Sequence, residues 1–182
     1  VEIATASVRR PLAVAPHPRY SDSVTDPTPP RPDPVVPHPP LTRYYDDGSK
    51  RRGWVDHMFD STARHYDWIN SVMSFGSGVW YRRDALERLG VGAGARLLDV
   101  CIGTGLVARA VRDLVGAGGE VVDLDASLGM LFEARRVIPM PLVQGYVEKL
   151  PLDGERFDFV TMGYALRHVA DLRSTFAEYR RV

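Results

Sequence analysis

The fold is decided by the stretch Leu98-Asp99-Val100-Cys101-Ile102-Gly103-Thr104-Gly105-Leu106-Val107-Ala108. A short apolar run ends in two glycines that are one residue apart, and apolar residues at helical spacing follow over residues 106–115. Glycine lets the backbone approach a ligand where a Cβ atom would collide. The pattern predicts a strand that turns through a ligand-binding loop into a helix.

Further strands and helices alternate on the C-terminal side of this stretch. We expect strands at 96–101, 120–125, 142–145 and 157–162, helices at 106–115 and 128–137, and a last helix capped by Asp171. This order predicts an α/β fold of the Rossmann-like type, in which four parallel strands are joined by right-handed crossovers. Upstream, apolar spacing predicts one helix near residues 54–59 and another at 81–89, separated by a loop at 70–78.

Composition divides the chain into three segments. With 182 residues, of which 45% are hydrophobic, the chain can bury one core. Residues 1–45 are rich in proline and are expected to form a disordered tail, residues 46–92 a helical cap, and residues 93–182 an incomplete ligand-binding domain. The fourth strand would then have an exposed edge, which favours aggregation or a homodimer.

Charge and cysteine content exclude several functions. The 23 basic and 23 acidic side chains give a net charge of zero, so no nucleic-acid partner is expected. The sequence has neither an apolar run of membrane-spanning length nor a signal peptide, which predicts a cytoplasmic chain with at most peripheral membrane contact. Cys101 is the single cysteine, so neither a disulfide framework nor a metal site is expected.

The glycine turn and a later acid together predict an adenosine site. Asp125 ends the next strand about 20 residues after Gly105, where a carboxylate can accept hydrogen bonds from both ribose hydroxyls. Asp99 would repel a pyrophosphate but could pair with a cationic sulfonium cofactor. The spacing Gly103-x-Gly105-x-x-Ala108 also satisfies a dinucleotide fingerprint, so a fragment of an NAD-dependent reductase stays an alternative.

Five ordered motifs carry a family resemblance. They are Met58-Phe59-Asp60-Ser61 with Tyr66-Asp67-Trp68-Ile69-Asn70, the glycine turn, Leu124-Asp125-Ala126-Ser127, Val143-Gln144-Gly145-Tyr146-Val147, and Phe157-Asp158-Phe159 through Leu166-Arg167-His168. With them, residues 54–182 resemble the ubiquinone/menaquinone biosynthesis C-methyltransferases, which are class I methyltransferases dependent on S-adenosylmethionine.

The resemblance implies S-adenosyl-L-methionine as the cofactor and a role for each matching residue. Gly103, Thr104 and Gly105 would wrap the amino-acid part of the cofactor, and Asp125 would hold its ribose. The adenine would be contacted by the following set: Ala126, Met130, Tyr146 and Val147. Gly163 would offer main-chain contacts, and Tyr66 would close the site as part of a lid.

The implied reaction is methylation of a carbon atom in a quinol or a related phenolic ring, with a lipophilic small molecule as acceptor. His168 would remove a phenolic proton and Arg167 would stabilise the phenolate. Several positions depart from the family pattern: Cys101 and Ile102 are bulkier than usual, Tyr146 replaces an acid or amide, Gly163 replaces a serine, and His168 replaces an asparagine. A catalytically inactive or truncated adenosine-binding module is therefore the alternative.

Overall fold

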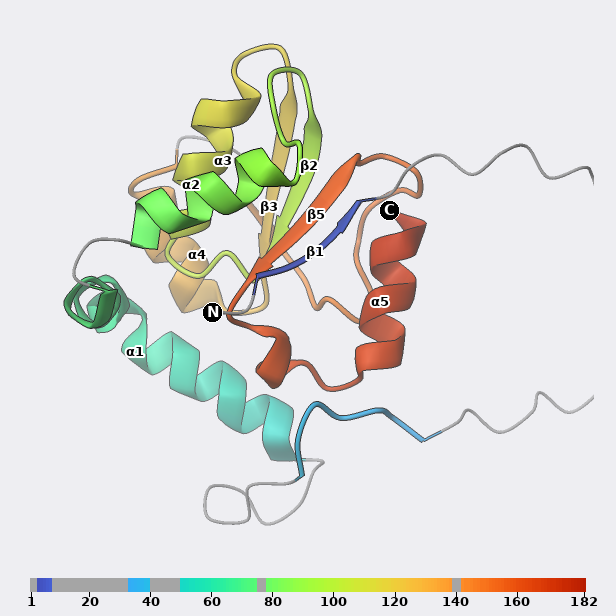
Figure 1. Cartoon of the computed structure of the whole chain (residues 1–182). Helices are drawn as coiled ribbons and strands as arrows, with labels where there is room; N and C mark the ends of the chain where they lie inside the picture. Colours follow the sequence, from blue (N-terminus) through green and yellow to red (C-terminus); the bar gives the residue numbers. More distant parts are fainter. Residues whose placement is uncertain (1–2, 8–32, 40–49, 75–77, 139–141) are drawn as a thin grey trace, which may run out of the picture.

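The central sheet confirms the parallel α/β prediction (Figure 1). The computed structural model describes residues 3–7, 33–39, 50–74, 78–138 and 142–182. Within them the strands follow the order β1-β5-β2-β3-β4. Four strands run parallel: β2 (Arg96–Val100), β3 (Glu120–Asp125), β4 (Leu142–Gln144) and β5 (Phe159–Gly163). The chain moves from β2 outward to β4 and returns to β5 on the other side of β2, so a crevice is expected where the strands end.

Alternating side chains on β2 send apolar residues to both faces of the sheet. Leu97 packs with α2 (Gly78–Arg88) and α3 (Leu106–Val115), whereas Leu98 packs on the opposite face with Tyr179 of α5 (Leu172–Arg181). The helix α4 (Leu128–Arg135) packs beside α3 through a third apolar cluster. Helices on both faces keep the sheet buried, as a parallel sheet requires.

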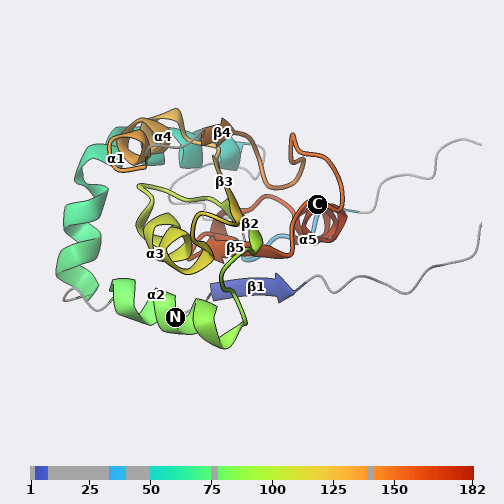
Figure 2. The ribbon, with the colours of Figure 1, turned by 90° about the horizontal axis from the view of Figure 1, so that it is seen from above.

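Helix α1 (Arg51–Ser74) is longer than the sequence indicated. The predicted loop at 70–78 was too long at both ends, because α1 continues through Ser74 and α2 begins at Gly78. Residues 75–77 lie outside the described residues. In Figures 1 and 2, α1 lies beside α4 at the end of the sheet where the loop after β2 begins. Two hydrogen bonds join the helices there, since Asp60 Oδ1 accepts from Ser127 Oγ at 2.5 Å and from the Gly129 N–H at 3.0 Å.

The N-terminal segment contains a strand that the sequence analysis did not expect. Strand β1 (Ile3–Ser7) pairs antiparallel with β5, with Thr5 opposite Thr161. The prediction of disorder over residues 1–45 was therefore wrong for this segment. The outer edge of β5, predicted to be exposed, pairs with β1 instead (Figure 2). Another part of this N-terminal segment contacts the start of α5, because the Leu172 N–H donates to the Val35 carbonyl at 2.8 Å.

Candidate functional site

A cavity of about 560 Å³ opens where β2, β3 and β5 end. Predicted site residues that line it are Gly103, Asp125, Ala126, Met130, Tyr146, Val147, Gly163 and His168. Four others do not line it: Asp99, Thr104, Gly105 and Arg167. Tyr66 belongs to α1, but its side chain lies outside the described residues. The C-terminal ends of the strands thus gather most of the predicted set at one place.

The glycine turn after β2 forms one wall of the cavity. Gly103 lines it, whereas Gly105 packs away from it, with a φ of 86° and Ile138 so close that an added Cβ would lie 2.4 Å from Cδ1. Ile102 is buried in the apolar cluster between α3 and α4 and does not line the cavity. Of the two positions that are bulkier than the family pattern, Ile102 therefore lies inside the core, whereas Cys101 lines the cavity.

Asp125 is the acid best placed to bind a ligand. Its Oδ2 accepts from the Gly103 N–H at 2.8 Å and its Oδ1 from the Ser127 N–H at 2.9 Å, which ties the end of β3 to the glycine turn. Burial raises the pKa of this carboxyl, and these N–H groups oppose the rise. Each carboxylate oxygen has a second lone pair, so the group can still accept hydrogen bonds from two ligand hydroxyls.

Asp99 does not take the position that was predicted for it. The side chain is buried beneath the cavity, where its Oδ1 accepts from Thr161 Oγ1 at 2.8 Å. Burial and the neighbouring carboxyl of Asp123 raise the pKa of Asp99 to about 8, so the group is largely uncharged at neutral pH. Asp99 is therefore not placed to form a direct ion pair with a cationic cofactor.

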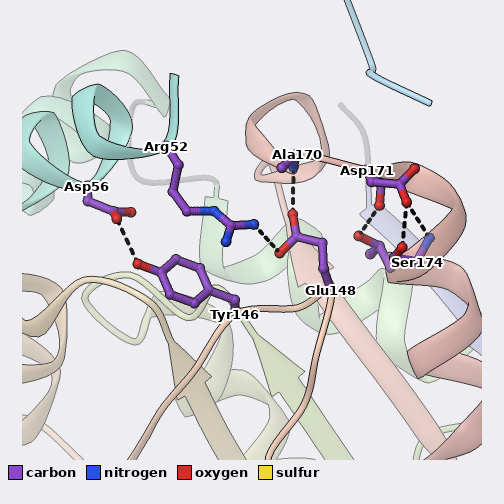
Figure 3. Close-up of polar contacts among 8 residues, drawn as sticks. Arg52, Asp56, Tyr146, Glu148, Ala170, Asp171 and Ser174 are labelled. Atoms are coloured by element: carbon purple, nitrogen blue, oxygen red, sulfur yellow. Dashed lines mark hydrogen bonds and ion pairs between the residues drawn. The ribbon is translucent and has the colours of Figure 1, made fainter. Parts of the chain in front are cut away.

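Helix α1 and the loop after β4 build a polar wall (Figure 3). Tyr146 donates from its hydroxyl to Asp56 Oδ2 at 2.8 Å, and the guanidinium of Arg52 lies 4.4 Å from the centre of the tyrosine ring. Arg52 also pairs with Glu148 at 3.4 Å, and Glu148 accepts from the Ala170 N–H at 2.6 Å. This wall connects the helical cap to the sheet across the cavity.

His168 also lines the cavity and belongs to the short 3-10 helix η2 (Leu166–His168). Its ring meets Phe59 edge-on, with the ring centres 5.1 Å apart. Burial, together with Arg167 and Arg51, lowers the pKa of His168 to about 4, so the ring is neutral at pH 7. Arg167 Nε donates to Nε2 at 3.1 Å, which leaves the proton of the neutral ring on Nδ1.

Sequence reasoning missed the cavity residues on the first turns of α1. Arg51, Arg52 and Asp56 all line the cavity, although they lie more than 40 residues before the glycine turn. Their charges resemble those of any solvated helix face. Only the packing of α1 across the strand ends turns them toward the site, and no local spacing encodes that packing.

The cavity suits an adenosine-containing ligand. Asp125 offers acceptors for ribose hydroxyls, and apolar contacts for a purine come from Ala126, Met130 and Val147. A cavity of about 560 Å³ lies within the range of small-molecule sites. The residues that the structure describes therefore fit the nucleoside half of S-adenosylmethionine.

Known proteins resemble this chain in sequence. Residues 46–182 match the ubiE/COQ5 methyltransferase family. A demethylmenaquinone methyltransferase of Geobacillus kaustophilus is 39% identical over 134 residues, which cover 70% of this chain and 57% of the relative. Another, from Mycobacterium sp. strain KMS, is 40% identical over 128 residues, which cover 70% of this chain and 54% of the relative. The chain thus spans a little more than half the length of these relatives.

A solved structure shares the fold. A methyltransferase from Aquifex aeolicus, described as dependent on S-adenosylmethionine, superposes with a TM-score of 0.53 over 56% of this chain and 57% of the other, at 22% identity. The sequence match covers three structural features of the chain. They are the order of the four parallel strands, the glycine turn and the acid at the end of β3. This chain belongs to the ubiE/COQ5 methyltransferase family.

Proposed function

We propose that the cavity binds S-adenosyl-L-methionine and that the protein containing this chain methylates a ring carbon of a quinol. The observation that carries the cofactor proposal is Asp125, whose carboxyl lines the cavity while two backbone N–H groups fix its orientation. The acceptor class is taken from the demethylmenaquinone methyltransferases that the chain resembles.

The residues of the chain would act mainly by positioning. When bound, S-adenosylmethionine supplies a methyl group activated on a sulfonium. Asp125 holds the ribose, and Met130 and Val147, both buried, exclude water from the base. His168 would face the acceptor as a neutral ring that donates from Nδ1. To act as a base it would first have to release the N–H group of Arg167.

Partners and location follow from the same proposal. The acceptor would be a lipophilic small molecule, with membrane contact at most peripheral, and the chain would act in the cytoplasm. No helix among residues 50–74, 78–138 and the other described segments is both long and apolar enough to cross a bilayer. A homodimer stays a prediction from the sequence.

A second candidate is a module that binds the cofactor without turnover. Two observations favour it: the Tyr146 hydroxyl is committed to Asp56, and the carboxyl of Asp99 lies outside the cavity. Such a module would bind S-adenosylhomocysteine but would not transfer a labelled methyl group to a demethylated quinol. The NAD-dependent alternative has no support from the matching family, which consists of methyltransferases.

Titration calorimetry with S-adenosylhomocysteine tests the cofactor proposal. Asp125→Asn keeps the shape of the side chain and removes its charge, and we expect the affinity to fall by roughly 10- to 100-fold, since hydrogen bonds to a charged group contribute about 1.5–3 kcal/mol. Asp113→Asn is the matched control, because Asp113 is exposed on α3 and outside the cavity. Equal affinities in the two variants would contradict the proposal.

A further inference from the structure

Arg51 brings a buried positive charge to the cavity. The residue is 7% exposed, lies in the first turn of α1 and lines the cavity close to His168. Its Nη2 donates to the carbonyl oxygen of Arg167 at 2.6 Å and to Nε2 of His38 at 3.2 Å. Both acceptors are uncharged atoms, so these hydrogen bonds position the guanidinium without neutralising it.

The acids that line the cavity form hydrogen bonds or ion pairs with groups other than Arg51. Within the described part of the chain they are Asp56, Asp125, Glu148 and Asp171. Asp56 accepts from Tyr146, and Glu148 accepts from the Ala170 N–H and pairs with Arg52 (Figure 3). Two of the four acids therefore have partners on the wall drawn there.

The remaining two acids are fixed by backbone groups. Asp171 caps α5 and also accepts from the Val35 N–H at 2.8 Å, while Asp125 accepts from Gly103 and Ser127. None of these contacts involves Arg51. Among the described residues, its charge is therefore available to a ligand.

The surroundings of Arg51 favour an anion. The guanidinium groups of Arg51 and Arg167 both lie close to His168, and burial together with these two charges lowers the pKa of its ring. Arg167 itself does not line the cavity and takes part through its carbonyl and its Nε. The anion-stabilising role that the sequence suggested for Arg167 thus falls on a residue 116 positions earlier.

We propose that Arg51 binds the acceptor as an oxyanion, with its guanidinium holding the deprotonated hydroxyl of an electron-rich aromatic ring. This inference rests on the proposed function, because it names the state in which the acceptor occupies the same site. The hydroxyl proton passes to solvent water, and the phenolate oxygen accepts N–H hydrogen bonds from Arg51. Deprotonation enriches the ring in electrons, and the positive charge favours that form.

A chromophoric phenol tests the proposal without turnover. 1-Naphthol, a bicyclic phenol with no second hydroxyl, is bound to the chain in the presence of S-adenosylhomocysteine, and its ionisation is followed by absorbance against pH. We expect the pKa of the bound naphthol to lie at least about one unit below its value in free solution, as for an acid beside an arginine. Arg51→Gln should return it close to the free value, and Arg51→Lys should keep part of the shift.

Arg83→Gln is the matched control for removing one positive charge. Arg83 lies on α2 in an exposed pair with Glu87 and does not line the cavity, so the naphthol pKa should stay lowered in this variant. A lowered pKa that persists in folded Arg51→Gln would overturn the assignment. Folding of each variant is checked by its melting curve and by its affinity for S-adenosylhomocysteine.

The unsubstituted chain provides a test that does not depend on a variant folding. Calorimetry in buffers of different ionisation enthalpy counts the protons released when naphthol binds. Midway between the bound and free pKa values, a one-unit shift corresponds to release of about half a proton per naphthol and a larger shift to more. Release of this size supports the proposal, and no release contradicts it. Failure to bind S-adenosylhomocysteine would instead count against the proposed function, so the two failures are distinguishable.

Discussion

Gly105 shows how one residue fixes the glycine turn against the core. Its φ of 86° is unfavourable for any side chain, and a Cβ atom would lie 2.4 Å from Ile138 Cδ1. Gly105→Ala should therefore destabilise the chain by roughly 2–4 kcal/mol, from backbone strain and overpacking together. Gly90→Ala is the control, since Gly90 has a φ of 84° in open space, and about 1–2 kcal/mol is expected there. Urea denaturation measures both, and equal losses would refute the role of Ile138.

The lowered pKa of His168 predicts that the stability of the folded chain depends on pH. Its pKa is lowered from 6.5 to about 4 in the folded chain, so between these values the unfolded chain binds more protons. Stability should fall as the pH drops from about 6.5 toward 4. His168→Asn should reduce this fall, whereas His57→Asn, on the outer part of α1, should leave it unchanged. Melting temperatures at pH 7 and pH 5 provide the measurement; an unaltered difference in His168→Asn would refute the assignment.

Residues at the strand ends could be predicted from sequence because two local signals fix them. Asp125 follows an apolar strand, and Gly103 belongs to a glycine turn, so parallel pairing brings both to one edge of the sheet. Arg51 carries no such signal. Its role depends on where α1 packs, which is decided by contacts such as Asp60 with Ser127.

At the scale of elements, β2 and β3 place two acids opposite each other. Asp99 and Asp123 are register partners; Asp123 pairs with Arg112, and Asp99 is held by Thr161. One oxygen of each carboxyl has no hydrogen-bond partner in the structure. Burial is the main reason that the pKa of Asp99 rises from 3.8 to about 8.

From the raised pKa of Asp99 we predict that Asp99→Asn stabilises the chain. Because the folded state holds the Asp99 proton up to about pH 8 and the unfolded state releases it near 3.8, stability contributed by Asp99 is lost as the pH rises between these values. Asp99→Asn removes that loss and should stabilise the chain by on the order of 1–3 kcal/mol at pH 8, with little effect at pH 4.

Asp123→Asn is the comparison variant, because it removes the charged partner of Arg112 and should destabilise the chain at pH 8. Melting curves of both variants at pH 4 and pH 8 give the measurement. Destabilisation of a folded Asp99→Asn at pH 8 would show that this carboxyl is needed in its charged form.

The element boundaries illustrate why sequence periodicity has limits. Strand β3 and helix α3 begin and end where predicted, since their apolar residues alternate or repeat cleanly. The end of α1 was placed too early, because Gly, Ser and Asn near residues 70–78 are typical of a loop. Proline in residues 1–45 likewise hid Ile3–Ser7, a short segment that gains its hydrogen bonds only by pairing with the distant β5.

At the scale of the whole molecule, the cap and the sheet form the site together. Neither α1 nor the strand ends alone would enclose the cavity, since its walls include Arg51 and Asp56 on one side and Asp125 and His168 on the other. The Rossmann-like part was predictable from its alternation of strands and helices. A helical cap was expected as well, but the cap residues that line the cavity, such as Arg51 and Asp56, were not, because they depend on contacts between residues far apart in the sequence.

A crystal structure of the chain with S-adenosylhomocysteine tests the central claim most directly. The account predicts density in the cavity, with both ribose hydroxyls about 2.7 Å from the carboxylate oxygens of Asp125 and the purine against Met130 and Val147. Density at another site, or a cavity that stays empty at saturating ligand while Asp125 keeps its two N–H partners, would contradict the account.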